Sequence, residues 1–550
     1  MRLAQLTRRL TLTLFAACFL AQGQSLKIAP DLATLLTQPN LQAPVIVQYT
    51  SSPGLLDLSK LRLLGGSVDK QFSVIPAVAG RISIAGLLSL VLDGRVAYVS
   101  LDRTVAGTLD TAVQTVNANV AASQYGLTGS GVGVAVIDSG IYAHPDLQGR
   151  VVYRQSFIGG SSADDYGHGT HVAGIVAGSG SASPNGALRG IAPGARLIDL
   201  RVLNAQGGSS DSVVIAAIDR AVQLKNRYNI RVINLSLGRP VKEPHRWDPL
   251  CRAVRAAHDA GIAVVVAAGN LGRNSYATVL SPANEPAAIT VGAMKTMATP
   301  GRGDDLIASY SSKGPTLFDL TVKPDLVAPG NMVVSLLAPG SAIAQEYPEN
   351  VVGSHYLRLS GTSMAAPMVA GTAALMIERE PGLSPDAVKM RLMKSATKTF
   401  PLTSVAVDPS GMVYPSAYDV YTVGAGYLDV LGAIQDQDAP SGYSLSPRAN
   451  FNLLTRQADL LADPSSTWAL GAASQPMAVW GPIMAGPQGN AAAWGTNIWG
   501  SAAAWGTAAA WGTAAAWGTA AGWGTAAAWG TAAAWGTAAA WGTNIQGSGE

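Results

Sequence analysis

Cysteines, charged residues and long apolar runs are all scarce in this chain, and each shortage argues against a class of protein. Cys18 and Cys251 are its two cysteines, which argues against a disulfide framework and against a multi-cysteine metal site. Charged residues make up 13% of the chain, about half the usual share, so a strongly charged binding surface is not expected. No segment has about 18 uninterrupted apolar residues, so no membrane-spanning helix is expected.

The charge balance gives no reason to expect a polyanionic partner. The formal charge is +3, but Arg2, Arg8 and Arg9 lie in the first 24 residues, which contain no acid. The rest of the chain has equal numbers of basic and acidic residues. A near-neutral chain of this kind is not predicted to bind nucleic acid or an anionic membrane.

Residues 1–24 have the pattern of a secretory signal peptide. Arg8 and Arg9 precede the apolar run LTLTLFAACFLA at 10–21, and AQG at 21–23 offers small residues for cleavage. Export to the extracellular space is therefore expected. FAAC, which ends at Cys18, also resembles a lipobox with a poor first residue, so retention at the cell surface as a lipoprotein stays an alternative.

Residues 43–105 predict a small α+β unit. APVIVQYT at 43–50 is typical of a strand, and LLDLSKLRLL at 55–64 is typical of a helix. VIPAVAGRISI at 74–84 predicts a strand pair, and GRVAYVSLDRTV at 94–105 predicts a closing strand. The βαββαβ-like order favours a ferredoxin-like arrangement of helices on one sheet.

From about residue 130 the pattern changes to strands that alternate with helices. The runs VGVAVIDSG, ARLIDLRVL, VINLSLG, IAVVVAAGN and AAITVGA are short and nearly continuously apolar, as expected for a parallel sheet buried on both faces. Helical spacing lies between them at 211–228 and 249–261. Ligands of such doubly wound α/β sheets bind beyond the carboxyl ends of the strands, where Asp138, Ser236 and Asn270 are expected.

The last part of the chain is of low complexity. From 502 to 543 a six-residue unit, AAAWGT with one AAGWGT, recurs seven times. Because the period is even, an extended strand would place every tryptophan on one face, whereas a helix would scatter them. Two interpretations stay open, a flexible processed tail and an aromatic surface for cell-wall, glycan or self-association contacts.

Three segments carry the chemistry: VAVIDSGI at 134–141, YGHGTHVAG at 166–174 and SGTSMAAPMVAG at 360–371. Together they resemble the active-site signatures of the subtilisin-like serine proteases, in the bacterial secreted type with an inhibitory propeptide, and the resemblance runs over most of 100–435. It implies a subtilisin-like doubly wound sheet and a secreted endopeptidase that acts on polypeptides. No cofactor is required for that chemistry.

The residue types in these segments fit the parts of a catalytic triad. The Ser363 hydroxyl is a weak nucleophile until a base removes its proton, and His168 is able to do so near neutral pH. Asp138 is expected to hold the imidazole tautomer and to stabilise the imidazolium without becoming protonated. Its alternative role is a helix cap after the strand.

The same resemblance assigns the residues around the triad. Asn270 resembles the side-chain donor to the oxyanion, and a helix that begins at Ser363 would add backbone N–H groups. The expected substrate-binding residues are Ser236, Leu237 and Gly238 on one rim, and Gly207 and Gly208 on the other, with the peptide added as a strand between them. The resemblance also places Leu280 where a glycine often forms the floor of the specificity pocket, which would narrow that pocket.

Metal binding and the second histidine of the helix need separate interpretation. Asp146 in HPDL could bind a structural calcium ion, but loop oxygens cannot be counted from sequence, so calcium is left open and no other metal ligand is assigned. His171 lies three residues after His168 without an HExxH pattern, and is expected to be a packed core histidine. His144, His245, His258 and His355 show no recognisable partner in the sequence.

The expected organisation is a signal peptide at 1–24, an inhibitory propeptide at 25–105, a peptidase domain at 106–436, a linker at 437–490 and a WGTAAA repeat tail at 491–550. By the resemblance, the propeptide is an intramolecular inhibitor that assists folding and is cut off by the protease itself. Parallel sheets fold slowly, which gives such a segment a physical purpose.

Two competing functions stay open at this point. In the first, the protein is a cell-surface adhesive protein whose tryptophan-rich tail is the functional part. In the second, it is a narrow maturation protease that processes one partner. A probe that reacts with an active serine separates the adhesive protein from the protease, because it labels a working triad alone.

Overall fold

A computed structural model describes residues 27–28, 32, 34–72, 76–101, 108–408, 411–452 and 457–467. The chain divides into two compact units, residues 1–105 and 106–550. None of the helices in the described ranges combines the length and the apolar character needed to cross a membrane.

The first unit is a four-stranded antiparallel sheet with two helices. Its elements are η1 (Thr34–Thr37), β1 (Gln42–Tyr49), α3 (Leu55–Leu63), β2 (Lys70–Gln71), β3 (Ala77–Ser83), α4 (Ile84–Leu90) and β4 (Val96–Leu101). The strand order β2-β3-β1-β4 together with the element order βαββαβ is the ferredoxin-like arrangement. Residues along β1 alternate between exposed and buried, so one face of the sheet packs against the apolar side chains of the helices, among them Leu61 and Leu87.

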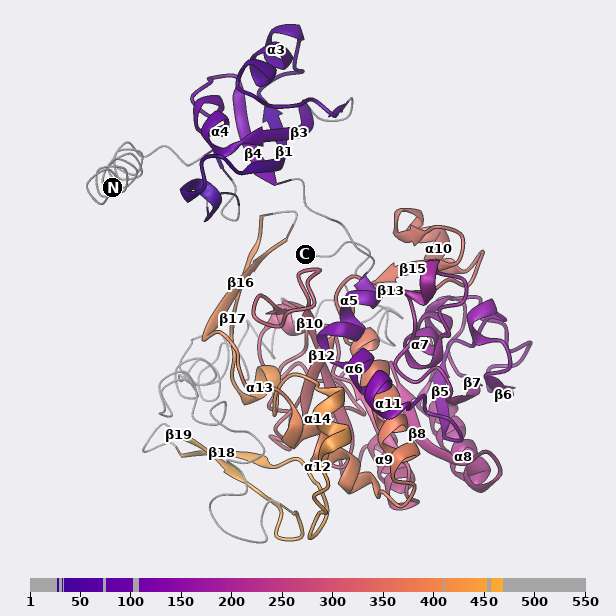
Figure 1. The fold of residues 1–550 in the computed structure, drawn as a ribbon. Coiled ribbons are helices and arrows are strands. Elements are labelled where there is room, and N and C mark those ends of the chain that lie inside the picture. The colour runs from indigo at the N-terminus through magenta and orange to yellow at the C-terminus, as the bar shows by residue number, and fades with distance from the viewer. Residues whose placement is uncertain are drawn as a thin grey trace, which may run out of the picture. The chain divides into compact units, whose positions relative to one another are not determined.

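The second unit is built on an eight-stranded sheet (Figure 1). Its strands are β5 (Gly133–Asp138), β6 (Val151–Ser156), β7 (Arg196–Arg201), β8 (Ile230–Leu235), β9 (Ala263–Ala267), β10 (Ile289–Lys295), β11 (Leu306–Ile307) and β12 (Leu326–Pro329). The order is β11-β10-β9-β8-β5-β7-β6, with β12 also paired to β10, and every pair is parallel except β10 with β11. The apolar runs identified in the sequence form these central strands.

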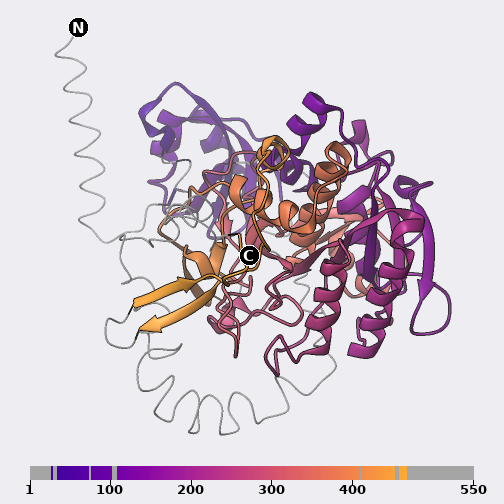
Figure 2. The ribbon, with the colours of Figure 1, turned by 90° about the horizontal axis from the view of Figure 1, so that it is seen from below.

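Helices cover both faces of this sheet (Figures 1 and 2). The helices α7 (His168–Ala177) and α11 (Thr362–Arg379) share one hydrophobic core with Val134 and Val136 of β5. The helices α8 (Asp211–Tyr228) and α9 (Pro249–Asp259) share a second core with Ala135 and Ile137. Because successive side chains of a strand point to opposite faces, a fully apolar strand contributes to both cores.

Shorter elements surround these layers. The helices are α5 (Thr108–Thr115), α6 (Ala118–Tyr125), η2 (Pro145–Leu147), η3 (Pro184–Gly186), η4 (Gly272–Asn274), α10 (Ala342–Glu346), η5 (Pro348–Asn350), α12 (Pro385–Ser395), α13 (Val420–Val423) and α14 (Val430–Gln435). The strands are β13 (Val333–Leu336), β14 (Val351–Val352), β15 (Tyr356–Leu359), β16 (Thr403–Val407), β17 (Val413–Ala417), β18 (Arg448–Asn452) and β19 (Gln457–Leu461). β13, β14 and β15 form a small antiparallel sheet, and β16–β17 and β18–β19 are hairpins.

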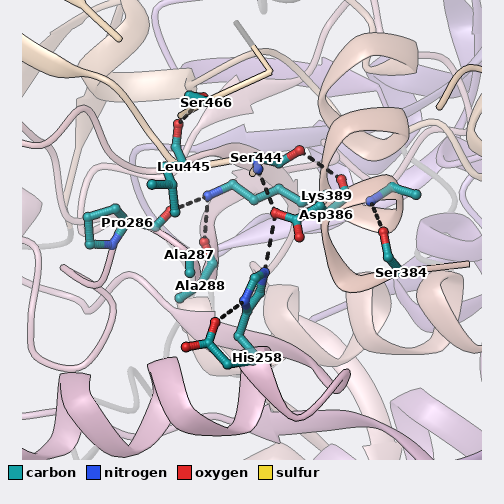
Figure 3. Close-up of polar contacts among 12 residues, drawn as sticks. His258, Pro286, Ala287, Ala288, Ser384, Asp386, Lys389, Ser444, Leu445 and Ser466 are labelled. Atoms are coloured by element: carbon teal, nitrogen blue, oxygen red, sulfur yellow. Dashed lines mark hydrogen bonds and ion pairs between the residues drawn. The ribbon is translucent and has the colours of Figure 1, made fainter. Parts of the chain in front are cut away.

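The described residues after 436 differ from the linker expected there. Ser444 donates from its backbone N–H to Asp386 Oδ1 at 2.5 Å, and its hydroxyl donates to the Asp386 carbonyl at 2.8 Å (Figure 3). Lys389 Nζ donates to Ser446 Oγ at 2.7 Å, and that hydroxyl donates to Asp325 Oδ1 at 2.5 Å. Residues 441–452 and 457–467 therefore belong to the second unit. Composition alone could not indicate this, because the anchoring groups lie on α12 and at Asp325, directly before β12.

The sheet topology determines where a site can form. From β5 the chain first adds β6 and β7 on one side, and then adds β8, β9 and β10 on the other. The switch in direction lies between β5 and β8, which pair directly. Crevices of doubly wound sheets open at such a switch point, beyond the carboxyl ends of the strands.

Candidate active site

Asp138 and His168 meet at this edge of the sheet. Asp138 is the last residue of β5, and His168 is the first residue of α7. His168 Nδ1 lies 2.8 Å from Asp138 Oδ1, and each side chain is 1% exposed. An N–H at Nδ1 that donates to the carboxylate leaves Nε2 as the acceptor, which is the tautomer a general base requires.

The surroundings of His168 favour its protonated form. Burial lowers the pKa of His168, but the charge and hydrogen bond of Asp138, with a further contribution from Asp164, raise it by more, so the net shift is upward. The Asp138 carboxylate also accepts a hydrogen bond from the Ser139 N–H at 2.8 Å. Asp138 therefore stabilises the imidazolium that would form during proton transfer.

Ser363 lies in the first turn of α11, which begins at Thr362. Its hydroxyl donates to the carbonyl oxygen of Ser236 at 3.2 Å, and the Ser236 hydroxyl donates back to the Ser363 carbonyl at 2.9 Å. Ser236 directly follows β8. Two hydrogen bonds thus link the first turn of α11 to the carboxyl end of β8.

The Asp138–His168 pair and Ser363 are anchored to neighbouring strands, β5 and β8. Val136 of β5 pairs with Asn234 of β8, and Asp138 and Ser236 each lie two residues further along. Neighbouring strands lie about 4.8 Å apart. Within the residues that the structure describes, His168 Nε2 has no hydrogen-bond partner, and the Ser363 hydroxyl is turned to Ser236. The structure therefore forms the Asp138–His168 contact and not a Ser363–His168 hydrogen bond, a contact that often forms only when substrate binds.

Asn270 lies at the amino end of α11. Its Oδ1 atom accepts hydrogen bonds from the Thr362 backbone N–H at 2.9 Å and from the Thr362 hydroxyl at 3.0 Å. The amide Nδ2 then faces Gly361, where an added Cβ atom would lie 3.1 Å from it. The amide donor and the amino end of the helix, with its N–H groups, are thus brought together beside Ser363.

Leu280 fills the space between the loops that follow β8 and β9. A Cβ atom added to Gly238 would lie 3.0 Å from Leu280 Cβ, and one added to Gly269 would lie 2.7 Å from Leu280 Cγ. Gly238 lies two residues after Ser236, and Gly269 directly precedes Asn270. The leucine side chain therefore packs between Gly238 and Gly269.

The other expected rim is a tight turn. Asn204 Oδ1 accepts hydrogen bonds from the N–H groups of Gln206 and Gly208, each at 2.9 Å. Gly207 has a φ of +73°, a conformation that glycine adopts without steric strain. Gly207 and Gly208 therefore lie in a locally braced loop directly after β7.

His171 is a core histidine, as predicted. Its Nε2 atom lies 3.1 Å from the Val333 carbonyl oxygen and 3.0 Å from that of Leu357, and the residue is fully buried. Burial, with a smaller contribution from the charge of His168, lowers the pKa of His171 to about 3. His171 therefore stays neutral across the range in which His168 titrates.

Asp146, the calcium ligand that the sequence left open, is buried and accepts hydrogen bonds on both carboxylate oxygens. Oδ1 accepts hydrogen bonds from the Ser181 hydroxyl at 2.9 Å and from the Ala182 N–H at 2.7 Å. Oδ2 accepts from the Tyr356 hydroxyl at 2.9 Å. Each carboxylate oxygen has two lone pairs, so Oδ2, with this one donor, keeps a lone pair for a further donor or a cation. No group of three or more His, Cys, Asp or Glu side chains in the described ranges is arranged to hold a metal ion.

Sequence reasoning missed two residues behind the Asp138–His168 contact, Ser139 and Asp164. The Ser139 hydroxyl donates to Asp164 Oδ1 at 2.7 Å, and Asp164 is 6% exposed. The sequence did hold one signal for Asp164. Gly167 has no side chain to cap the helix that starts at His168, and Asp164 is an acid three residues before it.

Comparisons with known proteins identify the family of this chain. The profile of the Subtilase family matches residues 129–410. Serine protease AprX of Bacillus subtilis (strain 168) is 42% identical over 337 residues, which cover 60% of this chain and 75% of that protein. Subtilisin E of the same strain is 36% identical over 341 residues, 60% of this chain and 78% of that protein. The extracellular serine proteinase of Thermus sp. (strain Rt41A) is 35% identical over 390 residues, 68% of this chain and 83% of that protein.

Among solved structures, that of a cold adapted subtilisin-like serine proteinase is 30% identical in sequence, with a TM-score of 0.40. It covers 56% of this chain and 90% of its own. The matched family accounts for the parallel sheet as a subtilisin-like α/β fold. The chain belongs to the subtilase family, and it is a serine protease that hydrolyses peptide bonds.

Proposed function

We propose that the protein is a secreted serine endopeptidase, made as a precursor, that cleaves peptide bonds through an acyl-enzyme on Ser363. The 2.8 Å contact between Asp138 and His168 carries this proposal, because it fixes the tautomer that a general base needs. Ser363 lies in the first turn of α11 and is hydrogen-bonded to Ser236, which follows β8, the strand that pairs with β5. This position supports its role as the nucleophile.

In the proposed mechanism, His168 Nε2 accepts the proton of the Ser363 hydroxyl as Oγ attacks the carbonyl carbon of the peptide bond. The tetrahedral intermediate collapses, the C–N bond breaks, and the amine leaves with the proton from His168. A water molecule then gives a proton to His168 and attacks the ester on Ser363. The second collapse releases the new carboxyl terminus and restores the serine hydroxyl.

The charge that develops on the carbonyl oxygen needs hydrogen-bond donors. The Asn270 amide and the N–H groups at the amino end of α11 meet this need, since both lie beside Ser363. These groups are held in place before substrate binds, because the side-chain oxygen Oδ1 of Asn270 accepts a hydrogen bond from the Thr362 N–H. Preorganised donors of this kind act mainly on the transition state.

The substrate is proposed to be an extended segment of polypeptide. It would add as a strand between the Ser236–Leu237–Gly238 rim and the turn at Gly207 and Gly208, through backbone hydrogen bonds that tolerate many sequences. Leu280 occupies the gap between Gly238 and Gly269. We therefore expect a preference for a small side chain on the amino side of the scissile bond.

The division of the chain is part of the same proposal. Residues 1–24 act as the signal for export, and residues 25–105 act as a propeptide that inhibits the protease until it cuts the junction itself. The separate compact unit up to residue 105 supports this division. The peptidase domain then begins at 106, and the repeat at 491–550 is not needed for hydrolysis of peptides.

A fluorophosphonate probe tests the catalytic assignment, because it reacts covalently with an activated serine. We expect the probe to label the wild-type protein and not Ser363→Ala, which should also accumulate as the uncut precursor. Ser123→Ala is the matched control, since Ser123 is exposed on α6. Labelling of Ser363→Ala, or a mature band of normal size from that variant, would contradict the proposal.

A further inference from the structure

The helix that carries His168 has no cap of its own. The residue before it, Gly167, has a φ of +98° and no side chain with which to accept a hydrogen bond from the first turn. Asp164 supplies the missing acceptor. Its Oδ1 atom accepts from the Gly167 N–H at 2.7 Å, and its Oδ2 atom accepts from the Thr170 N–H at 2.8 Å and from the Thr170 hydroxyl at 2.5 Å.

The same carboxylate is joined to the end of β5 through Ser139. The Ser139 hydroxyl donates to Asp164 Oδ1 at 2.7 Å and accepts a hydrogen bond from the Gly169 N–H at 2.8 Å. Its backbone N–H donates to Asp138 Oδ1 at 2.8 Å. Asp164 and Ser139 are hydrogen-bonded to each other and to the two residues that flank His168. Asp164 accepts from the Gly167 N–H, and Ser139 accepts from the Gly169 N–H.

The first turn of α7 packs so closely against the end of β5 that the two can shift little relative to each other. A Cβ atom added to Gly169 would lie 2.2 Å from the Gly140 carbonyl oxygen and 3.2 Å from the Asp138 Cβ atom. The first turn of α7 is thus in direct contact with the end of β5. A shift of that turn would move the imidazole relative to its carboxylate.

The neighbouring acids do not make this connection. Asp165 is 55% exposed at its side chain and pairs with Arg201 at 2.8 Å. Asp199, on β7, accepts hydrogen bonds from the Ile141 N–H and from Arg154. Of these three acids, Asp164 is the one whose hydrogen bonds join Ser139, the residue after β5, to the first turn of α7.

We propose that Asp164 is a positioning residue for peptide hydrolysis: through Ser139 and the first turn of α7, its carboxylate holds the His168 imidazole against Asp138. This inference rests on the proposed function, because it assigns His168 as the base. Asp164 contacts neither the substrate nor the reacting atoms.

The charge of Asp164 also bears on proton transfer. Among the titratable groups that face His168, Asp138 and Asp164 raise its pKa. His171 is neutral, and burial together with the charge of Asp138 raises the pKa of Tyr166, whose ring lies 6.2 Å from that of His168. Burial raises the pKa of Asp164 itself, against the hydrogen bonds from Thr170, Gly167 and Ser139. Removal of the Asp164 charge should therefore lower the pKa of His168.

The test compares Asp164→Asn with Asp165→Asn, which removes the same charge one residue away. For a small peptide substrate, we expect Asp164→Asn to lower kcat by about 10- to 100-fold, the loss that follows a small misplacement of a catalytic group, with little change in KM. The acid limb of its kcat/KM profile should move to lower pH. Asp165→Asn should match the wild type in both respects.

Ser139→Ala provides a second, independent variant, because it breaks the connection to β5 and keeps the charge of Asp164. It should lower kcat without moving the acid limb, and it decides the question if circular dichroism shows that Asp164→Asn does not fold. Wild-type kcat in Ser139→Ala, or equal losses in Asp164→Asn and Asp165→Asn, would overturn the inference. A failure of the proposed function itself would give a different result, because fluorophosphonate would then not label the wild-type protein.

Discussion

Asp138 Oδ1 and His168 Nδ1 lie 2.8 Å apart although 30 positions separate the two residues in the sequence. The contact forms because β5 ends at one residue and α7 begins at the other, on the same edge of the sheet. Both side chains are 1% exposed, so water does not compete for this hydrogen bond. The strength of the contact in the low-dielectric interior sets how His168 titrates.

The first prediction concerns the pH dependence of kcat/KM for a small chromogenic peptide. His168 must be neutral to accept the serine proton, and its pKa is raised in the folded protein. Activity should therefore be lost as pH falls through an apparent pKa above about 6.5, the value of an unperturbed histidine. Initial-rate assays from about pH 5 to about pH 9 measure this dependence of kcat/KM on pH.

The same pKa shift has the opposite sign for stability. A histidine with a raised folded-state pKa contributes stability that is fully present below its unfolded-state pKa and is lost as pH rises through the folded-state pKa. Thermal denaturation of Ser363→Ala should show this loss over the interval in which the wild type gains activity. If the acid limb of the kcat/KM profile lay at or below the pKa of free histidine, Asp138 would not raise the pKa of His168 as we expect.

The second prediction concerns Asn270. If its amide stabilises the oxyanion, Asn270→Ala should lower kcat by about 10²- to 10³-fold and leave KM nearly unchanged, because the donor acts in the transition state. Steady-state kinetics on a peptide anilide measures both constants. Asn274→Ala is the control, since Asn274 is exposed in η4. A proportional rise in KM would instead indicate a role in substrate binding.

The third prediction concerns the size of the specificity pocket. Leu280→Ala removes the branched end of the side chain that packs between Gly238 and Gly269. The ratio of kcat/KM for a peptide with Phe before the scissile bond to that with Ala should rise by about tenfold or more. Leu402→Ala, at an exposed leucine on the surface, serves as the control. An unchanged ratio would remove Leu280 from the pocket.

The fourth prediction separates the hairpin of β18 and β19 from the tail. A chain that ends at residue 467 should keep the unfolding free energy of the full chain. One that ends at residue 436 should lose roughly 1.5–3 kcal/mol for each hydrogen bond to a buried charged group that the truncation removes. Asp325 and Lys389 each lose such a hydrogen bond, since both bond to Ser446 and are about fully buried, while their ion pair with each other remains.

Urea denaturation in the Ser363→Ala background measures these free energies without self-digestion. Ser446→Ala in the longer chain should reproduce part of the loss, because it removes the shared hydroxyl and leaves the hairpin in place. If the chain that ends at residue 436 were as stable as the full chain, the hairpin would be an accessory to the domain.

Much of the site was predictable because local patterns encode it. The strands were identified from apolar runs, and the polar residues that end them, Asp138 and Asn270, lie at the carboxyl edge as expected. Glycine and alanine around His168 and Ser363 allow helices to begin close to other backbone, as at Gly169. Position in a strand or helix thus located these residues without any knowledge of their distant neighbours.

Contacts between distant segments were beyond such reasoning. His258, which showed no partner in the sequence, lies 3.3 Å from Asp386 of α12 (Figure 3). Asp146 accepts a hydrogen bond from Tyr356, which is 210 positions away in the sequence. The hairpin after 436 and the capping of α7 by Asp164 are of the same kind. Each depends on which buried donor meets which buried acceptor.

The sequence by itself determined which residue types stand at the ends of the strands and at the start of each helix, and so which of them could take part in acyl transfer. The tertiary structure alone decided that Asp138 and His168 touch, that the Ser363 hydroxyl turns to Ser236, and that Leu280 packs between Gly238 and Gly269. The reason is physical. Propensity and periodicity act over a few residues, whereas a buried polar group must find a partner wherever the fold brings one.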